Sequence, residues 1–233
     1  MSPKPIFDFL KVCMKKTMYG RFAFILLAYL LSGPSLTLAQ SDSKSQEILK
    51  SVSSKYKSYK TVQANFKLTR VDQKTKKPEV MTGTITVSAA KFNFVLGDQT
   101  VMSDGKITWT YLKESNEVQI SENVPSENTI TPTSIFTMYE KGFKTRFIAE
   151  KSVGGKPVQQ IELVPEDARK NYSRILLQID KTGKFVNEAK IFEKGGNIIT
   201  YSIVKFSPNA SVTEELFTFN KAKFPGVEIV DLR

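Results

Sequence analysis

The strongest constraint on the fold is an alternation of apolar and polar side chains between positions 83 and 120. It recurs in three runs, Ile85-Thr86-Val87, Phe92-Asn93-Phe94 and Ile107-Thr108-Trp109-Thr110-Tyr111. Because successive side chains of a strand point to opposite faces, each run places its apolar residues on one face of a sheet. Gly97-Asp98 and Asp104-Gly105 separate the runs and are typical of hairpin turns. The pattern predicts one antiparallel sheet with a large, aromatic-rich inner face.

Residues 1–39 have the layout of a secretory signal peptide. Lysine and arginine side chains precede the apolar run 22–31, and Thr37-Leu38-Ala39 offers a small-x-small cleavage site. The apolar run is shorter than the roughly 20 residues that a spanning helix needs. A retained membrane anchor is the alternative, and Met14 and Met18 are alternative start sites. We therefore expect export, with residues 40–233 forming one domain that has its own core.

The composition of residues 40–233 excludes several kinds of chemistry. The only cysteine, Cys13, lies in the expected signal peptide, and the chain has no histidine. Disulfides, thiolate nucleophiles, histidine bases and the usual zinc ligands are therefore excluded from the exported part. The sequence contains neither a Gly-rich phosphate loop nor a GxSxG elbow. An enzyme that uses Asp, Glu, Lys or Tyr remains open, but no constellation of residues indicates one, so we expect no enzymatic activity.

The formal net charge of +11 indicates a basic exterior. The lysines are scattered, with no run of five or more, which disfavours a nucleic-acid-binding protein, as export also does. Basic charge on an exported protein suits an anionic membrane surface or an acidic protein partner. A surface that is basic only for solubility is the alternative.

The first part of the exported chain predicts a helix followed by two strands. Ser43 and Gln46 form a possible capping box, and apolar residues from Ile48 to Tyr59 recur at helical spacing, which predicts a helix over 43–60. Alternation then predicts strands at 64–69 and 81–88, joined by a charged turn.

A second helix is predicted in the middle of the chain. Thr131-Pro132 is typical of a helix start, and Gly142 of a helix end. Between them, Phe136 and Met138 give this helix an apolar side. It is either an ordinary core helix or a flap over an apolar cavity.

The second half of the chain predicts a meander of strands. These strands are expected at 143–150, 158–164, 173–180, 185–193, 198–206 and 215–219. About ten or eleven strands would then share only two helices. A sheet with so little cover closes on itself, dimerises or holds an apolar ligand, although each single apolar residue could equally be plain core.

The exported chain resembles the LolA family, the periplasmic carriers of outer-membrane lipoproteins. The matching pieces occur in order from Gln40 to Arg233: Ala64-Asn65-Phe66, Gly83-Thr84-Ile85-Thr86-Val87, Phe92-Asn93-Phe94, Ser103-Asp104-Gly105-Lys106-Ile107-Thr108-Trp109-Thr110-Tyr111, Thr131-Pro132, Phe217-Thr218-Phe219 and Pro225-Gly226-Val227. The segment that begins at Ser103 is the most recognisable one. No single motif is diagnostic, and the resemblance rests on their order.

The resemblance implies a mainly β fold: an unclosed antiparallel β-barrel with a helical lid over a hydrophobic cavity. It also implies a carrier that accepts lipoproteins from an inner-membrane ABC-type release complex, shields their acyl chains and delivers them to an outer-membrane acceptor. The carrier would be a monomer that needs no cofactor. The rival within the fold is a periplasmic sensor of the RseB type, which binds a lipid or a regulatory protein. The rival outside it is an interaction scaffold whose sheet face is simply core.

The cavity residues expected on this reading come from several strands and the middle helix. They are Phe66, Leu68, Ile85, Val87, Phe92, Phe94, Trp109, Tyr111, Phe136, Met138, Ile161, Leu163, Ile175 and Leu177. By position, Phe92 and Phe94 match the aromatic strand that lines the family's cavity and rim. The family typically latches its lid with the arginine of an Arg-Pro pair, and this place reads Ala89-Ala90 here. Arg70 and Arg146 are the candidates for a substitute latch.

Overall fold

The computed structural model describes residues 42–123 and 138–233. Its helices are the α-helix α2 (Ser43–Lys57) and the 3-10 helices η2 (Met138–Glu140), η3 (Glu214–Phe217) and η4 (Lys221–Lys223). Its strands are β1 (Val62–Val71), β2 (Pro78–Ser88), β3 (Lys91–Leu96), β4 (Gln99–Ser103), β5 (Ile107–Leu112), β6 (Glu117–Glu122), β7 (Phe143–Val153), β8 (Lys156–Pro165), β9 (Tyr172–Asp180), β10 (Phe185–Glu193), β11 (Ile198–Pro208) and β12 (Glu228–Asp231). The expected signal peptide and most of the predicted middle helix, with Thr131-Pro132 and Phe136, lie outside the described residues.

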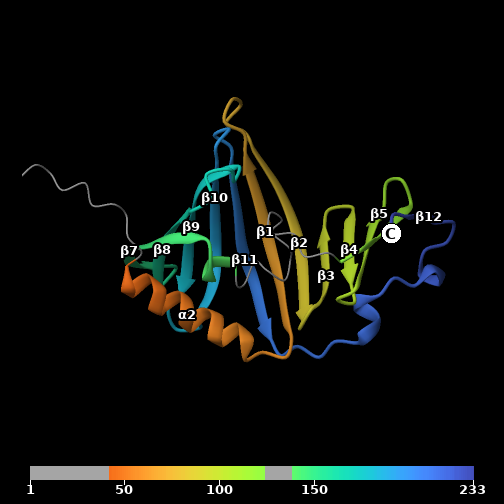
Figure 1. Cartoon of the computed structure of the whole chain (residues 1–233), viewed down its shortest axis with the longest axis horizontal. Helices are drawn as coiled ribbons and strands as arrows, with labels where there is room; N and C mark the ends of the chain where they lie inside the picture. Colours follow the sequence, from red (N-terminus) through yellow and green to blue (C-terminus); the bar gives the residue numbers. More distant parts are fainter. Residues whose placement is uncertain (1–41, 124–137) are drawn as a thin grey trace, which may run out of the picture. The chain divides into compact units, whose positions relative to one another are not determined.

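One sheet contains all the described strands, in the order β12-β6-β5-β4-β3-β2-β1-β11-β10-β9-β8-β7 (Figure 1). Neighbouring strands are antiparallel, except that β12 runs parallel to β6. The end strands β12 and β7 do not pair with each other, so the sheet is not closed. This confirms the predicted mainly β fold with an unclosed antiparallel sheet. The described part has twelve strands instead of the expected ten or eleven, and one of them, at 228–231, was not predicted from the sequence pattern.

The helix α2 is held at its start by Asp42 and not by the predicted capping box at Ser43. The Asp42 carboxylate accepts a hydrogen bond from the backbone N–H of Ser45 at 2.6 Å, which satisfies one of the free donors of the first turn. Leu49, Val52 and Tyr56 are buried at helical spacing. They join one hydrophobic core with sheet residues, and α2 contacts β7 and β10. We call the face of the sheet that α2 packs on the inner face, and the opposite one the outer face.

On the inner face, the ring of Phe66 lies against Gly83. A Cβ at Gly83 would lie 2.4 Å from Phe66 Cζ and 2.5 Å from the Val95 carbonyl oxygen, so the position has no room for a side chain. The ring of Phe66 stacks on Phe94 with centroids 5.5 Å apart. Glycine at this position therefore lets two aromatic rings of the inner face lie against each other.

The outer face has its own apolar layer, formed by the C-terminal segment. Phe217 is only 1% exposed, and η3 contacts β3 and β4. On the outer face, the Asn93 side chain donates a hydrogen bond to the Leu216 carbonyl at 2.9 Å. The predicted strand at 215–219 is therefore wrong: this segment forms the 3-10 helix η3, because it packs over strands instead of pairing with one.

The remaining local predictions agree with the structure where it describes them. The charged turn after β1 is present, with Asp72 Oδ1 accepting from the backbone N–H of Lys74 and Thr75, both at 2.9 Å. Gly142 has φ +79, as expected of a residue that ends a helix. Among the described residues, no helix is both long and apolar enough to cross a membrane.

Candidate functional site

The structure brings most of the predicted cavity residues to the inner face. Directly paired residues of neighbouring strands share a face, so the register places them there from β3 across to β8. Those on the inner face are Phe66, Leu68, Ile85, Val87, Phe92, Phe94, Ile161, Leu163, Ile175 and Leu177. Phe136 lies outside the described residues, and the structure does not describe the side chain of Met138.

Trp109 and Tyr111 do not lie on the inner face, so the prediction that they share a face with Phe94 is wrong. Phe94 pairs with Val101, and Val101 pairs with Thr110, so in β5 the threonines face inward. Tyr111 lies on the outer face, and its ring centroid is 4.5 Å from that of Phe224 in the C-terminal segment. The alternation in β5 was predicted correctly, but its apolar residues were assigned to the wrong face of the sheet. The error arose because the outer face of β4–β6 is also apolar and covered.

The apolar part of the inner face therefore has a limit within the sheet. Beyond β4, the residues in line with Phe94 are Thr110 in β5 and Gln119 in β6. At the other end, Leu163, Ile175 and Leu177 are almost completely buried. The apolar surface that remains partly exposed lies between these limits.

This partly exposed surface lies on β11, β2 and β3, on either side of the buried β1 residues Phe66 and Leu68, and we call it the open strip. It consists of side chains that pack against the core while staying partly accessible: Met81, Phe94, Leu96, Ile199, Tyr201 and Ile203. The helix α2 packs on β7 and β10 instead. Burial raises the pKa of the Tyr201 phenol, as expected for a hydroxyl on an apolar surface. The strip is suited to apolar groups.

The residues of β11 in the open strip were not among the predicted cavity residues. Ile199, Tyr201 and Ile203 alternate with Thr200 and Ser202, which is the same signal that identified the other strands. The sequence did not indicate that β11 pairs with β1. In this pairing, Tyr201 lies opposite Leu68 and Ile203 lies opposite Phe66. These partners are far apart in the chain, so only the tertiary structure brings them together.

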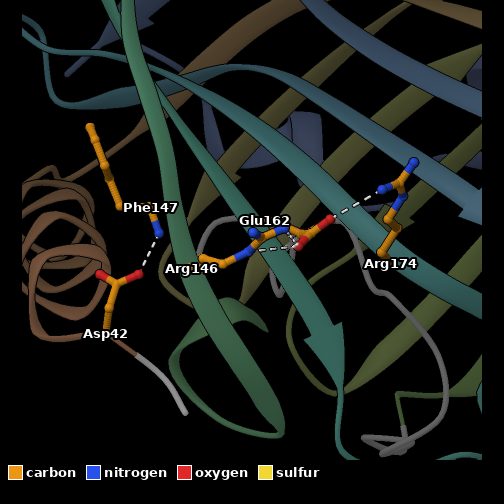
Figure 2. Close-up of polar contacts among 5 residues, drawn as sticks. All are labelled: Asp42, Arg146, Phe147, Glu162 and Arg174. Atoms are coloured by element: carbon orange, nitrogen blue, oxygen red, sulfur yellow. Dashed lines mark hydrogen bonds and ion pairs between the residues drawn. The ribbon is translucent and has the colours of Figure 1, made fainter. Parts of the chain in front are cut away.

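The start of α2 is fastened to the edge strand β7 by Asp42 (Figure 2). Its Oδ2 accepts from the Phe147 backbone N–H at 2.5 Å, and its own N–H donates to the Thr145 carbonyl at 3.1 Å. The bond to Phe147 lies at a register shift between β7 and β8. Burial would raise the pKa of Asp42, but the N–H groups of Ser45 and Phe147 outweigh it and lower that pKa. The helix is thus held on β7 by an ionised carboxylate.

A groove of about 440 Å³ lies between α2, β7 and η2. Leu49, Tyr139 and Phe143 contribute to its lining, but its rim is polar. Glu140 accepts hydrogen bonds there from Lys57, at 2.6 Å, and from Ser53. These bonds, that of Lys57 foremost, lower the pKa of Glu140. The groove is less suited to an acyl chain than the open strip, because an apolar chain there would remove the charged groups of its rim from water.

The two candidate latch residues lie on different faces. Arg146 is on the outer face, where its Nη2 lies 2.7 Å from Glu162 Oε2 (Figure 2), so it is not placed to latch a segment on the inner face. Arg70 is exposed and lies opposite Ile199 at one end of the open strip, and its role as a latch stays a prediction. Ala89, where the family's Arg-Pro pair was expected, is a turn residue with φ +53.

Among the described residues, no cluster of three or more His, Cys, Asp or Glu could hold a metal ion. The densest charged cluster in Figure 2 is Glu162 between Arg146 and Arg174. It lies on the outer face, across the sheet from the apolar side chains.

The family model described as "Outer membrane lipoprotein carrier protein LolA" matches residues 57–220. No curated protein sequence matches the chain.

Solved structures resemble the fold at low sequence identity. An uncharacterised conserved protein from Thermus thermophilus is 14% identical, with a TM-score of 0.56 over 81% of this chain and 99% of that one. The lipoprotein LppX of Mycobacterium tuberculosis is 12% identical, with a TM-score of 0.47 over 74% and 99%. A LolA superfamily protein from Nitrosomonas europaea is 10% identical, with a TM-score of 0.42 over 75% and 97%. Of these three, only the Thermus structure supports the fold assignment.

Proposed function

Because this chain belongs to the LolA family, we propose that it is a periplasmic carrier that shields the acyl chains of lipoproteins and takes them from the inner to the outer membrane. The observation that carries this proposal is the open strip, an apolar surface in line with the core that α2 leaves partly exposed. Its partners would be the lipoprotein, an inner-membrane ABC-type release complex and an outer-membrane acceptor. The carrier would act as a monomer, without enzymatic activity or nucleic-acid binding.

The physical need for such a carrier follows from the hydrophobic effect. Each buried methylene of an acyl chain is worth about 0.8 kcal/mol, so a lipid-modified protein does not cross water unshielded. A carrier must also release its cargo. A surface made of many individually weak dispersion contacts, such as those of Phe94, Leu96 and Ile203, meets both requirements.

The open strip supports an acyl ligand better than a polar one. Its side chains are aliphatic or aromatic apart from the hydroxyl of Tyr201, and charged groups such as Arg70 stand only at its end. The neighbouring inner-face positions of β5 and β6 are threonine and glutamine, which limits the apolar surface on that side. An apolar chain would therefore lie across β11, β1, β2 and β3.

The test compares two substitutions on opposite faces of the same sheet. Phe94→Glu introduces a charge into the open strip, and Thr84→Glu introduces the same charge on the exposed outer face of β2. Uptake of a fluorescent fatty acid should be lost in Phe94→Glu and kept in Thr84→Glu, with both proteins folded by circular dichroism. Equal uptake by the two folded variants would refute a lipid site at the open strip.

Native mass spectrometry of the protein from its own envelope then separates the kinds of cargo. Co-purified acylated lipoprotein is the expected result. Bound phospholipid alone would keep the apolar site but contradict lipoprotein transport. A protein that carries no lipid and takes up no fatty acid would show that the strip is ordinary core, as in the scaffold alternative.

A further inference from the structure

Two hairpin tips stand side by side at one end of the sheet. One is the β1–β2 connection, residues 72–77, and the other is the β10–β11 connection, residues 194–197, both at the top of Figure 1. The Gln73 backbone N–H donates to Asn197 Oδ1 at 3.2 Å. A Cβ on Gly196 would lie 1.5 Å from the Gln73 side chain, so the tips are in close contact. We call the two connections together the double tip.

The double tip presents cations whose charge is not neutralised locally. Lys74, Lys76 and Lys77 are exposed, and none of them forms an ion pair with another described residue. The tip's own carboxylate, Asp72, accepts the backbone N–H groups of Lys74 and Thr75. Those hydrogen bonds hold the shape of the turn, and its three lysines are exposed.

The other carboxylates near the double tip form no ion pair with these lysines. Glu193 accepts from the Asn197 side chain at 3.2 Å, within the second hairpin. Glu79 lies directly opposite Arg70 on the neighbouring strand β1. The double tip itself carries Lys74, Lys76, Lys77 and Lys194 against the single carboxylate of Asp72, so it remains a cationic surface.

Apolar groups accompany the lysines at the same end of the sheet. Val80 is 54% exposed and Pro78 is exposed, both at the start of β2. The open strip begins close by, since Arg70 at the end of β1 lies opposite Ile199. The double tip thus combines positive charge, exposed apolar side chains and one end of the acyl-binding surface that was proposed above.

We propose that the double tip docks on an anionic lipid bilayer and brings the end of the open strip to the lipid headgroups. The inference rests on the proposed carrier function for its purpose, but the docking itself depends only on the tip. Lysines on an exposed turn that forms no pocket around them suit the mobile phosphates of many lipid headgroups better than a single ligand of defined shape. Val80 and Pro78 would enter the headgroup region beside them.

The experiment measures co-sedimentation of the protein with lipid vesicles. The vesicles are of phosphatidylcholine alone, or of phosphatidylcholine mixed with anionic phosphatidylglycerol. The test variant is Lys74→Gln/Lys76→Gln/Lys77→Gln. The matched control is Lys151→Gln/Lys156→Gln/Lys184→Gln, which removes the same charge from exposed positions at the opposite end of the sheet. Thermal unfolding and fatty-acid uptake are measured on every protein.

The expected result is preferential binding of the unmodified protein to the anionic vesicles. One lysine near such a surface contributes about fivefold in partitioning, so the test variant should bind roughly 100-fold more weakly. The control variant should bind almost normally. Salt should weaken the binding, because the screening length falls to about 3 Å at 1 M ionic strength.

Several outcomes would overturn the proposal. Equal losses in the two triple variants would mean that net charge alone drives binding, and no preference for anionic vesicles would exclude docking on anionic lipid. Uptake of fatty acid without vesicle binding would reject the docking site and leave the carrier intact. Vesicle binding that depends on the double tip, without any lipid uptake, would support the docking site and reject the carrier.

Discussion

Arg146 and Glu162 lie opposite each other on β7 and β8, with Arg146 Nη2 2.7 Å from Glu162 Oε2. Arg174 from β9 binds the other carboxylate oxygen of Glu162, with its Nη1 3.2 Å from Oε1. The Glu162 side chain is only 11% exposed, while both arginine side chains are at least half exposed. Two arginines thus bind one nearly buried carboxylate on the outer face, and these ion pairs connect β7, β8 and β9 (Figure 2).

Arg146→Met tests whether this arginine stabilises the sheet or controls the lipid site. We expect the free energy of unfolding to fall by about 1 kcal/mol, since an accessible arginine is lost while Arg174 still binds Glu162. Fatty-acid uptake should stay unchanged, because the side chain is on the outer face. Arg70→Met is the matched variant at the end of the open strip. An uptake defect in Arg146→Met at unchanged stability would contradict the purely structural role.

Glu162 should make the stability of the protein dependent on pH. Burial would raise the pKa of Glu162, but the hydrogen bonds and charges of Arg146 and Arg174 outweigh it, so its pKa lies below the ordinary value of 4.5. A lowered pKa means that the contribution is complete above the ordinary value and is lost as the pH falls through the folded-state value. Urea unfolding between about pH 6 and about pH 3 should therefore show a shallower loss of stability in Glu162→Gln. Parallel pH profiles would exclude this contribution.

Asp42 should carry a large share of the attachment of α2 to the sheet. Asp42→Ala removes both the helix cap and the acceptor for the Phe147 N–H, so we expect a loss of about 1–2 kcal/mol in unfolding free energy. Asp42→Asn keeps one acceptor oxygen and should lose less. Chemical denaturation followed by circular dichroism measures both. If the two variants lose the same amount of unfolding free energy, the hydrogen bond that asparagine retains contributes nothing.

Phe217 should stabilise the protein without taking part in lipid binding. Its side chain is 1% exposed and packs on the outer face, so Phe217→Ala should lower the unfolding free energy by about 3–5 kcal/mol. Phe217→Leu keeps most of the volume and should lose less than about 1.5 kcal/mol. In both variants, fatty-acid uptake per folded molecule should equal that of the unmodified protein. Reduced uptake by folded Phe217→Leu would place this residue in the lipid site.

Local patterns were sufficient to predict most strands and turns. Alternation placed β10 at its observed bounds, and Asp72 forms the turn that its neighbourhood predicted. These features depend on side-chain periodicity and turn chemistry within a few residues, which the sequence states directly. The strand predicted around Phe217-Thr218 is absent from the structure. A strand also needs a partner strand, and at that edge of the sheet β6 already pairs with β12.

The candidate site was predictable only in part. Phe66, Ile85 and Phe94 were expected together and lie together, because short hairpin connections keep neighbouring strands in register. Trp109 was assigned to the same face and lies on the other one. Alternation identifies two faces but does not say which one is inner when both are apolar.

The sequence by itself determined that this protein forms a mainly β sheet, that the sheet has a large apolar face with only two predicted helices to cover it, and that the family is LolA. Those properties follow from residue periodicity and from the order of motifs. Only the tertiary structure decided that β11 pairs with β1 and that the C-terminal segment covers the outer face. It also decided that the β1–β2 connection meets the β10–β11 connection at the double tip. The physical reason is that these contacts join residues far apart in the chain, and local preferences carry no information about such partners.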